Sequence, residues 1–73
     1  MSQRFNGPRA RRRRYELGLT VEQLADAIGA SKSYVSQIEN GAFDPGPARF
    51  AALVKALGIE DTQEMWTQEG DAA

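Results

Sequence analysis

Residues 18–41 read GLTVEQLADAIGASKSYVSQIENG, and the fold of the chain can be inferred from these residues. Thr20 and Gln23 have the spacing of a capping box, in which each side chain bonds to the backbone N–H of the other, so a helix begins just after Thr20. Gly29 ends this helix, because a residue without Cβ readily takes the left-handed conformation that closes a helix. Ser31 is a favoured cap for the next helix and follows only two residues later. The two helices therefore meet at a tight turn.

The second of these helices, expected over residues 32–40, separates its side chains by face. Val35 and Ile38 point inward. The outer stripe is polar and contains no acidic residue: it consists of Lys32, Ser33, Ser36, Gln37 and Asn40. Hydrogen-bonding groups of this kind suit base edges and phosphates, and an α-helix fits the major groove of DNA. From this helix alone, an ordinary solvated face is an equally good interpretation.

Helix signals also precede this pair, and no period-two pattern is sustained anywhere over the length of a strand. A first helix is expected to begin at Pro8, which suits the first turn, and to stop at Gly18. Its inward stripe is Ala10, Arg14 and Leu17.

Two more helices are expected after a loop at residues 42–46. The fourth runs from Pro47 to Gly58 and has one wide apolar stripe: Phe50, Leu53, Val54 and Leu57. A fifth, short helix follows Asp61 and carries the last large apolar residues of the chain, Met65 and Trp66. The predicted fold class is all-α, a compact bundle of about five short helices.

With 73 residues the chain has room for one domain, assigned to residues 9–68, after a basic flexible arm at residues 1–8 and before a frayed tail at residues 69–73. It contains no Cys and no His, so disulfides, the usual metal ligands and the commonest general base are all missing. We therefore expect no enzymatic activity, no cofactor, no metal and no small-molecule substrate. The longest apolar run, Phe50 to Val54, is too short to span a membrane, and the expected location is the cytoplasm.

The net charge of −1 hides an uneven distribution. Residues 1–14 contain six arginines and no acidic residue, which gives +6, whereas residues 15–73 contain three basic and all ten acidic residues, which gives −7. Such a division is typical of a small domain with one end directed at a polyanion. The alternative is a basic tail that only keeps the protein in solution.

The stretch 18–41 resembles the helix-turn-helix of the phage-repressor and Cro type of bacterial regulators, the XRE family. The resemblance rests on the small Ala25 where the helices approach, Gly29 in the turn, inward Val35 and Ile38, and the ending Ile38-Glu39-Asn40-Gly41. With the flanking helices it covers about residues 9–59. It implies a lambda-repressor-like domain with its helix-turn-helix at residues 20–40, and a sequence-specific transcriptional regulator, most often a repressor, that binds double-stranded DNA.

The resemblance also implies roles for individual residues. The helix at residues 32–40 is the recognition helix in this family, and its candidate base contacts are Lys32, Ser33, Ser36 and Gln37. The candidate phosphate contacts near that helix are Ser31, Tyr34 and Asn40, although simple packing is an equally good role for the Tyr34 ring. Further phosphate contacts are assigned to arginines elsewhere in the chain: Arg4, Arg9, Arg11, Arg12, Arg13 and Arg49.

Arg14 differs from the other arginines because it lies on the inward stripe of the first helix. A buried charge needs a partner, since its uncompensated burial costs several kcal/mol, and Glu39 is the expected one. The resemblance points the same way, because a matching Arg and Glu in related repressors form a structural ion pair between the first and third helices.

Two places depart from the family pattern. Val21 stands where the family usually has a phosphate-binding Gln, and the loop Ala42-Phe43-Asp44 lacks the usual Lys or Arg, while Asp44 would repel a nearby phosphate. DNA binding would then depend mainly on the basic arm. The alternative is a protein-interaction regulator on the same fold, antiactivator-like or antitoxin-like, with weak or no DNA binding and with Trp66 and the acidic last helices facing a regulatory protein partner.

Regulators of this kind generally bind DNA as symmetric dimers. The last helix offers a possible surface for such a homodimer: Ile59, Met65 and Trp66. The other possibility is that Trp66 folds back over the fourth helix and completes the small core.

Overall fold

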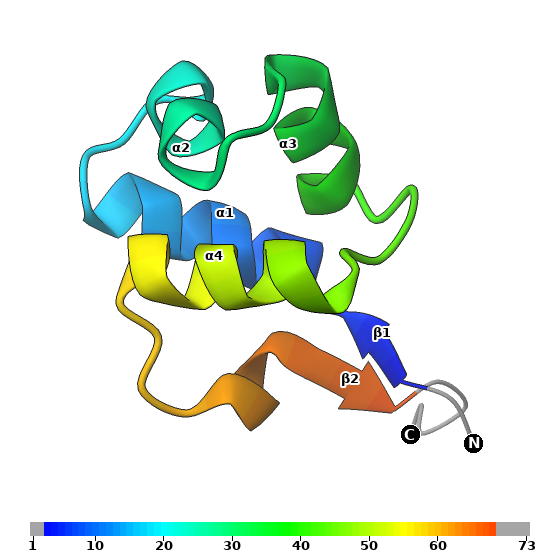
Figure 1. Ribbon diagram of the computed structural model, residues 1–73. Coiled ribbons are helices and arrows are strands. Elements are labelled where there is room, and N and C mark those ends of the chain that lie inside the picture. The colour runs from blue at the N-terminus through cyan, green and yellow to red at the C-terminus, as the bar shows by residue number, and fades with distance from the viewer. Residues whose placement is uncertain (1–2, 69–73) are drawn as a thin grey trace.

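The structure, a computed structural model, describes residues 3–68. The elements in chain order are β1 (Gln3–Phe5), α1 (Gly7–Glu16), α2 (Val21–Ile28), α3 (Lys32–Glu39), α4 (Pro47–Leu57), the 3₁₀ helix η1 (Thr62–Met65) and β2 (Trp66–Gln68). Figure 1 shows α2 and α3 on one side of the α1 and α4 pair, and the two strands on the other. The fold is therefore mostly helical, with four α-helices and one small strand pair.

The helix-turn-helix has the local bonds that its sequence predicts. The Thr20 N–H donates to Gln23 Oε1 at 2.8 Å and the Gln23 N–H to Thr20 Oγ1 at 3.0 Å, which completes the capping box. Ser31 Oγ accepts from the Tyr34 N–H at 3.1 Å and caps α3. Gly29 ends α2 with φ of 69°, a left-handed conformation that costs a residue with a Cβ about 1–2 kcal/mol.

The predicted fifth helix is wrong, and so is the expectation that the chain contains no strand. Asp61 does cap a turn by accepting from the Gln63 N–H at 3.1 Å, but only the 3₁₀ helix η1 forms before the chain extends into β2. β2 pairs antiparallel with β1, with Phe5 opposite Trp66. The adjoining Asn6 N–H also donates to the Met65 carbonyl at 2.6 Å. Pairing between the two ends of the chain therefore overrides a weak local helix signal.

The structure also corrects the described part of the predicted flexible arm, residues 3–8. Residues 3–5 form β1, and α1 already begins at Gly7, one residue before Pro8. The physical reason is Phe5, whose buried ring packs edge-on against two other aromatic rings. The centre of the Phe5 ring lies 5.6 Å from the centre of the Trp66 ring and 6.1 Å from that of the Phe50 ring. Residues 1–2 and the predicted frayed tail at 69–73 lie outside the described residues.

The core lies between the helices and is closed by the strand pair. Its buried apolar residues are Phe5, Ala10, Leu24, Ala25, Ile28, Val35, Ile38, Leu53, Leu57 and Met65. Leu17, expected on the inward stripe of the first helix, is exposed instead. Leu17 is the C-cap residue of α1, and the chain turns away from the helix directly after it, at Gly18 with φ of 71°.

Gly7 sets how closely α1 approaches the end of α3. A Cβ at this position would lie 2.4 Å from the Ile38 carbonyl oxygen and 2.6 Å from the Glu39 carbonyl oxygen. The backbones meet here without space for any side chain, which brings the first turn of α1 against the last turn of α3.

Candidate nucleic-acid interface

The outer stripe of α3 is exposed, as the sequence predicts. Its members are Lys32, Ser33, Ser36, Gln37 and Asn40, which caps the C-terminal end of the helix. The one acidic residue of α3, Glu39, faces the protein interior and is buried. The helix itself lies at the edge of the molecule, beside α2 (Figure 1). The exposed face of α3 thus offers one positive charge, uncharged hydrogen-bonding groups and no carboxylate to a polyanion.

α3 is anchored to α1 by a buried ion pair. Arg14 Nε donates to Glu39 Oε2 at 2.8 Å and Arg14 Nη2 donates to Glu39 Oε1 at 3.0 Å, so the contact is bidentate. The side chains are 6% and 3% exposed. A third bond, from Arg14 Nη1 to the Leu19 carbonyl at 3.0 Å, reaches the segment before α2. The structure therefore contains the pair that the sequence analysis expects, and it joins three segments of the fold.

The hydrogen bonds with Glu39 raise the pKa of Arg14 above the ordinary value for arginine. Burial acts in the opposite direction, but it is the smaller effect, and the negative charge of Glu39 adds to the increase. Arg14 therefore keeps its charge at every pH at which the protein would be studied.

Arg11 lies on the exposed side of this ion pair. Its Nε is 3.4 Å from Glu39 Oε1, and its Nη2 donates to Asn40 Oδ1 at the end of α3. Two guanidinium groups thus share one carboxylate, which leaves one positive charge in excess. Because Glu39 is buried and the Arg11 side chain is 37% exposed, this excess charge lies at the surface beside the α3 stripe.

Arg49 lies at the other flank of α3, in the first turn of α4. Its Nη1 donates to the Ile28 carbonyl at 2.8 Å and so bonds to the C-terminal end of α2. The same guanidinium lies 5.4 Å from the centre of the Tyr34 ring, within range of a cation–π contact. Tyr34 is half-buried, so its ring packs on the protein, one of the two roles that the sequence left open. The bond from Arg49 to Ile28 is not evident from the sequence, because it joins residues 21 apart.

Asp44, expected to repel a phosphate, is occupied within the protein. Its Oδ1 accepts from the Phe5 N–H at 3.0 Å and from Arg4 Nε at 3.2 Å. Arg4 Nη2 also donates to the Gly41 carbonyl at 3.1 Å. Asp44 therefore ties the loop after α3 to β1, and Arg4 offsets its charge. No local pattern could have revealed this contact, because Phe5 is 39 residues away along the chain.

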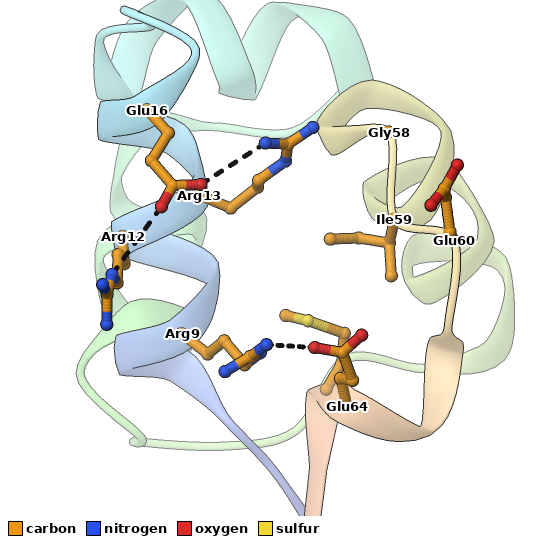
Figure 2. A pocket seen from close by; sticks show the side chains of 9 residues that line it. Arg9, Arg12, Arg13, Glu16, Gly58, Ile59, Glu60 and Glu64 are labelled. Carbon is orange, nitrogen blue, oxygen red and sulfur yellow. Dashed lines mark hydrogen bonds and ion pairs between the residues drawn. The ribbon is translucent and has the colours of Figure 1, made fainter.

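The remaining arginines of α1 face another part of the molecule. Arg9, Arg12 and Arg13 line a cavity of about 560 Å³ between α1 and residues 58–65 (Figure 2). Three glutamates line it as well, which balances the charge: Glu16, Glu60 and Glu64. Arg9 pairs with Glu64, Arg13 donates to the Leu57 carbonyl at 2.8 Å, and Arg12 lies 3.7 Å from Glu16. These arginines and Arg11 point to different sides of α1, because consecutive residues in a helix point about 100° apart.

In the structure, the arginines of the basic segment at residues 1–14 do not form a single surface. It brings Arg11 and Arg49 to the flanks of α3, and it places Arg4 against the loop after α3. Arg9 and Arg13 lie against the chain that follows α4, on the side away from α2 and α3, whereas the Arg12 side chain points outward from α1 and is 80% exposed (Figures 1 and 2).

The three residues of the possible dimer surface are largely used inside the protein. Met65 is fully buried, and Ile59 and Trp66 are half-buried against the core. The centre of the Trp66 ring lies 5.1 Å from the centre of the Phe50 ring in α4, and the Trp66 ring packs edge-on against Phe5. Trp66 therefore folds back over α4, which is the second of the two arrangements considered from the sequence.

Within residues 3–68, no group of three or more acidic residues is arranged to hold a metal ion. The helices in this part of the chain are also too short, or too polar, to cross a membrane.

The helix-turn-helix family matches residues 9–69 of the chain. An uncharacterized HTH-type transcriptional regulator of Methanothermobacter thermautotrophicus is 32% identical over 63 residues, which are 86% of this chain and 91% of the relative. Among solved structures, the P22 c2 repressor in complex with a synthetic operator has a TM-score of 0.78 and 30% identity, over 92% of this chain and 97% of that one. The restriction-modification controller protein C.AhdI from Aeromonas hydrophila has a TM-score of 0.73 and 36% identity, over 81% and 88% of the two chains. Together with the geometry of α2 and α3, these matches show that the chain belongs to the helix-turn-helix family, in its phage-repressor and Cro-like branch.

Proposed function

We propose that this protein is a transcriptional regulator that binds double-stranded DNA sequence-specifically, as a repressor, with α3 in the major groove. The observation that carries the proposal is the exposed, acid-free stripe of α3, held on a rigid base by the Arg14–Glu39 pair. The P22 c2 repressor, which has the same fold, is bound to an operator in its solved structure. A recognition helix must keep its orientation to read bases, and a bidentate buried pair provides that.

The base contacts are assigned to residues of the α3 stripe: Lys32, Ser33, Ser36 and Gln37. Lys32 can donate to guanine O6 and N7, and Gln37 can bond to adenine N6 and N7, while serine serves either base. Ser31 and Asn40, at the two ends of α3, and the Tyr34 hydroxyl at its flank are assigned to phosphates. Ser31 Oγ accepts from the Tyr34 N–H and still has its own hydroxyl proton to donate.

The charged phosphate contacts are assigned to the cations at the two flanks of α3, namely Arg11 and Arg49. This assignment differs from the basic arm favoured by the sequence, because Arg9 and Arg13 face the cavity between α1 and residues 58–65, and Arg12 lies at its edge beside Glu16. With about two phosphates neutralised by each chain of a DNA-bound dimer, log K should fall with log salt at a slope of about −3.6.

The experiment is a fluorescence anisotropy titration at several salt concentrations, with DNA selected by the protein from random duplexes. We expect Arg11→Ala to weaken binding to all sequences and, since a dimer loses two phosphate contacts, to reduce the slope by about 1.8. Arg12→Ala is the matched control, one residue away on the same helix, and should leave the slope unchanged. No binding at low salt would refute the proposed function. If Arg12→Ala, and not Arg11→Ala, reduces the slope of log K against log salt, the phosphate contacts come from the basic arm that the sequence favours.

Base reading is tested separately with Gln37→Ala. This variant should relax the preference at one base pair, with a loss of about 1–3 kcal/mol for the preferred base. A loss of the same size on every sequence would show that Gln37 reads no base.

The proposed regulator acts as a homodimer, because one recognition helix covers only a few base pairs. The selected sites should then be inverted repeats with centres about 10 base pairs apart. A regulatory protein partner remains the second candidate, because SinR, which shares this fold, is in complex with the SinI protein in a solved structure. Trp66 contributes less to such a surface than the sequence suggests, since its ring packs against Phe5 and Phe50.

A further inference from the structure

Phe43 is an exposed aromatic ring beside the recognition helix. Among the described residues, three large apolar side chains are exposed: Tyr15 at 64%, Leu17 at 42% and Phe43 at 38%. Tyr15 and Leu17 lie at the end of α1, whereas Phe43 lies in the loop between α3 and α4. Its ring is 5.5 Å from the ring of Tyr34, one of the residues of α3.

The position of Tyr34 places Phe43 beside the stripe that reads DNA in the proposed function. Residues three apart in a helix are surface neighbours, so Tyr34 lies next to Gln37. Phe43 packs against Tyr34 and therefore extends the outer surface of α3 toward α4 by one apolar side chain. The surface of polar and basic groups is thus bordered by a phenyl ring.

The backbone on both sides of Phe43 is fixed. Before it, the Ala42 N–H donates to the Gln37 carbonyl at 2.9 Å, and the Gly41 carbonyl accepts from Arg4 at 3.1 Å. After it, Asp44 accepts from the Phe5 N–H at 3.0 Å. The ring is therefore preorganised, and contact with a partner costs little conformational entropy.

The chemistry of the ring selects the group that it can contact on DNA. A phenyl group carries no charge and no hydrogen-bonding atom, so it gains nothing from a phosphate. In the major groove the apolar group on the base edges is the 5-methyl of thymine. We propose that Phe43 is a specificity-determining residue that contacts a thymine methyl at the edge of the site read by α3, an inference that rests on the proposed function.

The test uses operators selected by the wild-type protein from random duplex DNA. Each conserved thymine is replaced in turn by deoxyuridine, which lacks only the 5-methyl group, and dissociation constants are measured by fluorescence anisotropy. For one thymine, the wild type should lose about fourfold in affinity, the value of one buried methyl group. Phe43→Ala should bind the thymine and deoxyuridine duplexes equally, and Phe43→Leu should keep part of the difference.

Leu17→Ala is the matched control, because it removes another exposed apolar side chain and should keep the full thymine preference. Circular dichroism of each variant ensures that a change in affinity does not come from unfolding. A full thymine preference in Phe43→Ala would overturn the inference. This holds also if the variant binds both duplexes more weakly by the same factor, which indicates packing on the sugar. In those cases the Gln37→Ala result leaves the proposed function standing, whereas selection of no sequence at all would refute both.

Discussion

The Arg14–Glu39 ion pair offers the sharpest test of how this fold is held together. We expect Arg14→Ala to destabilise the protein strongly, because it leaves the Glu39 carboxylate, 3% exposed, without its bidentate partner. Removing one member of a buried pair generally costs about 3–5 kcal/mol. Arg11 remains 3.4 Å from Glu39 and compensates in part, so the expected loss is at the lower end, about 3 kcal/mol.

This loss is large for so small a domain. At about 0.05–0.15 kcal/mol per residue, a chain of 73 residues has a total stability of about 4–11 kcal/mol. For a domain of this size, each kcal/mol lowers Tm by about 4–8 °C, so Arg14→Ala should melt about 12–24 °C below wild type.

The assay is thermal unfolding followed by circular dichroism, with Arg12→Ala as the control. Arg12 is on the same helix, its side chain is 80% exposed, and its contact with Glu16 is 3.7 Å, so its removal should cost less than about 0.5 kcal/mol. Since the pKa of Arg14 is raised, its contribution is complete below the ordinary pKa of arginine and is lost only as the pH rises through the raised value. The difference between variant and wild type should therefore be the same at about pH 7 and pH 9.

The double variant Arg14→Met with Glu39→Met completes the test. Replacing a whole buried pair by apolar side chains is often neutral or stabilising, so most of the lost Tm should return. A Tm of Arg14→Ala no lower than that of Arg12→Ala would refute the structural role. A double variant less stable than Arg14→Ala would refute the explanation by an unpaired buried charge.

Two further predictions concern contacts between the first residues of the chain and the α3 region. Gly7→Ala should lower the free energy of unfolding by about 1–3 kcal/mol in chemical denaturation, because its Cβ would collide with the Ile38 carbonyl. Gly46→Ala is the control and should have a smaller effect, because a Cβ there has nothing within 4 Å. Equal effects of the two variants would contradict the close contact at Gly7. Asp44→Ala should leave the Phe5 N–H without its acceptor and cost about 1–2 kcal/mol, with faster hydrogen exchange at Phe5; unchanged exchange there would rule out the tether.

The helix-turn-helix can be predicted from the amino-acid sequence, because its signals are local. The capping box at Thr20, the left-handed Gly29 and the Ser31 cap each involve residues within a few positions of one another. The same is true of the exposed α3 stripe, which follows from helical periodicity alone. The buried Arg14 could be inferred too, since a charge on an inward stripe needs a partner.

The pairing of β1 with β2 depends on tertiary contacts. Phe5 and Trp66 are far apart in sequence, so nothing local shows that their rings pack together and convert an arm and a short helix into a strand pair. The arginines of α1 read as one basic block along the chain, but successive helical residues point about 100° apart, so Arg11 faces the end of α3 and Arg12 faces solvent beside Glu16. Packing of distant residues, which one-dimensional patterns do not contain, thus selected which positive charges border the recognition helix.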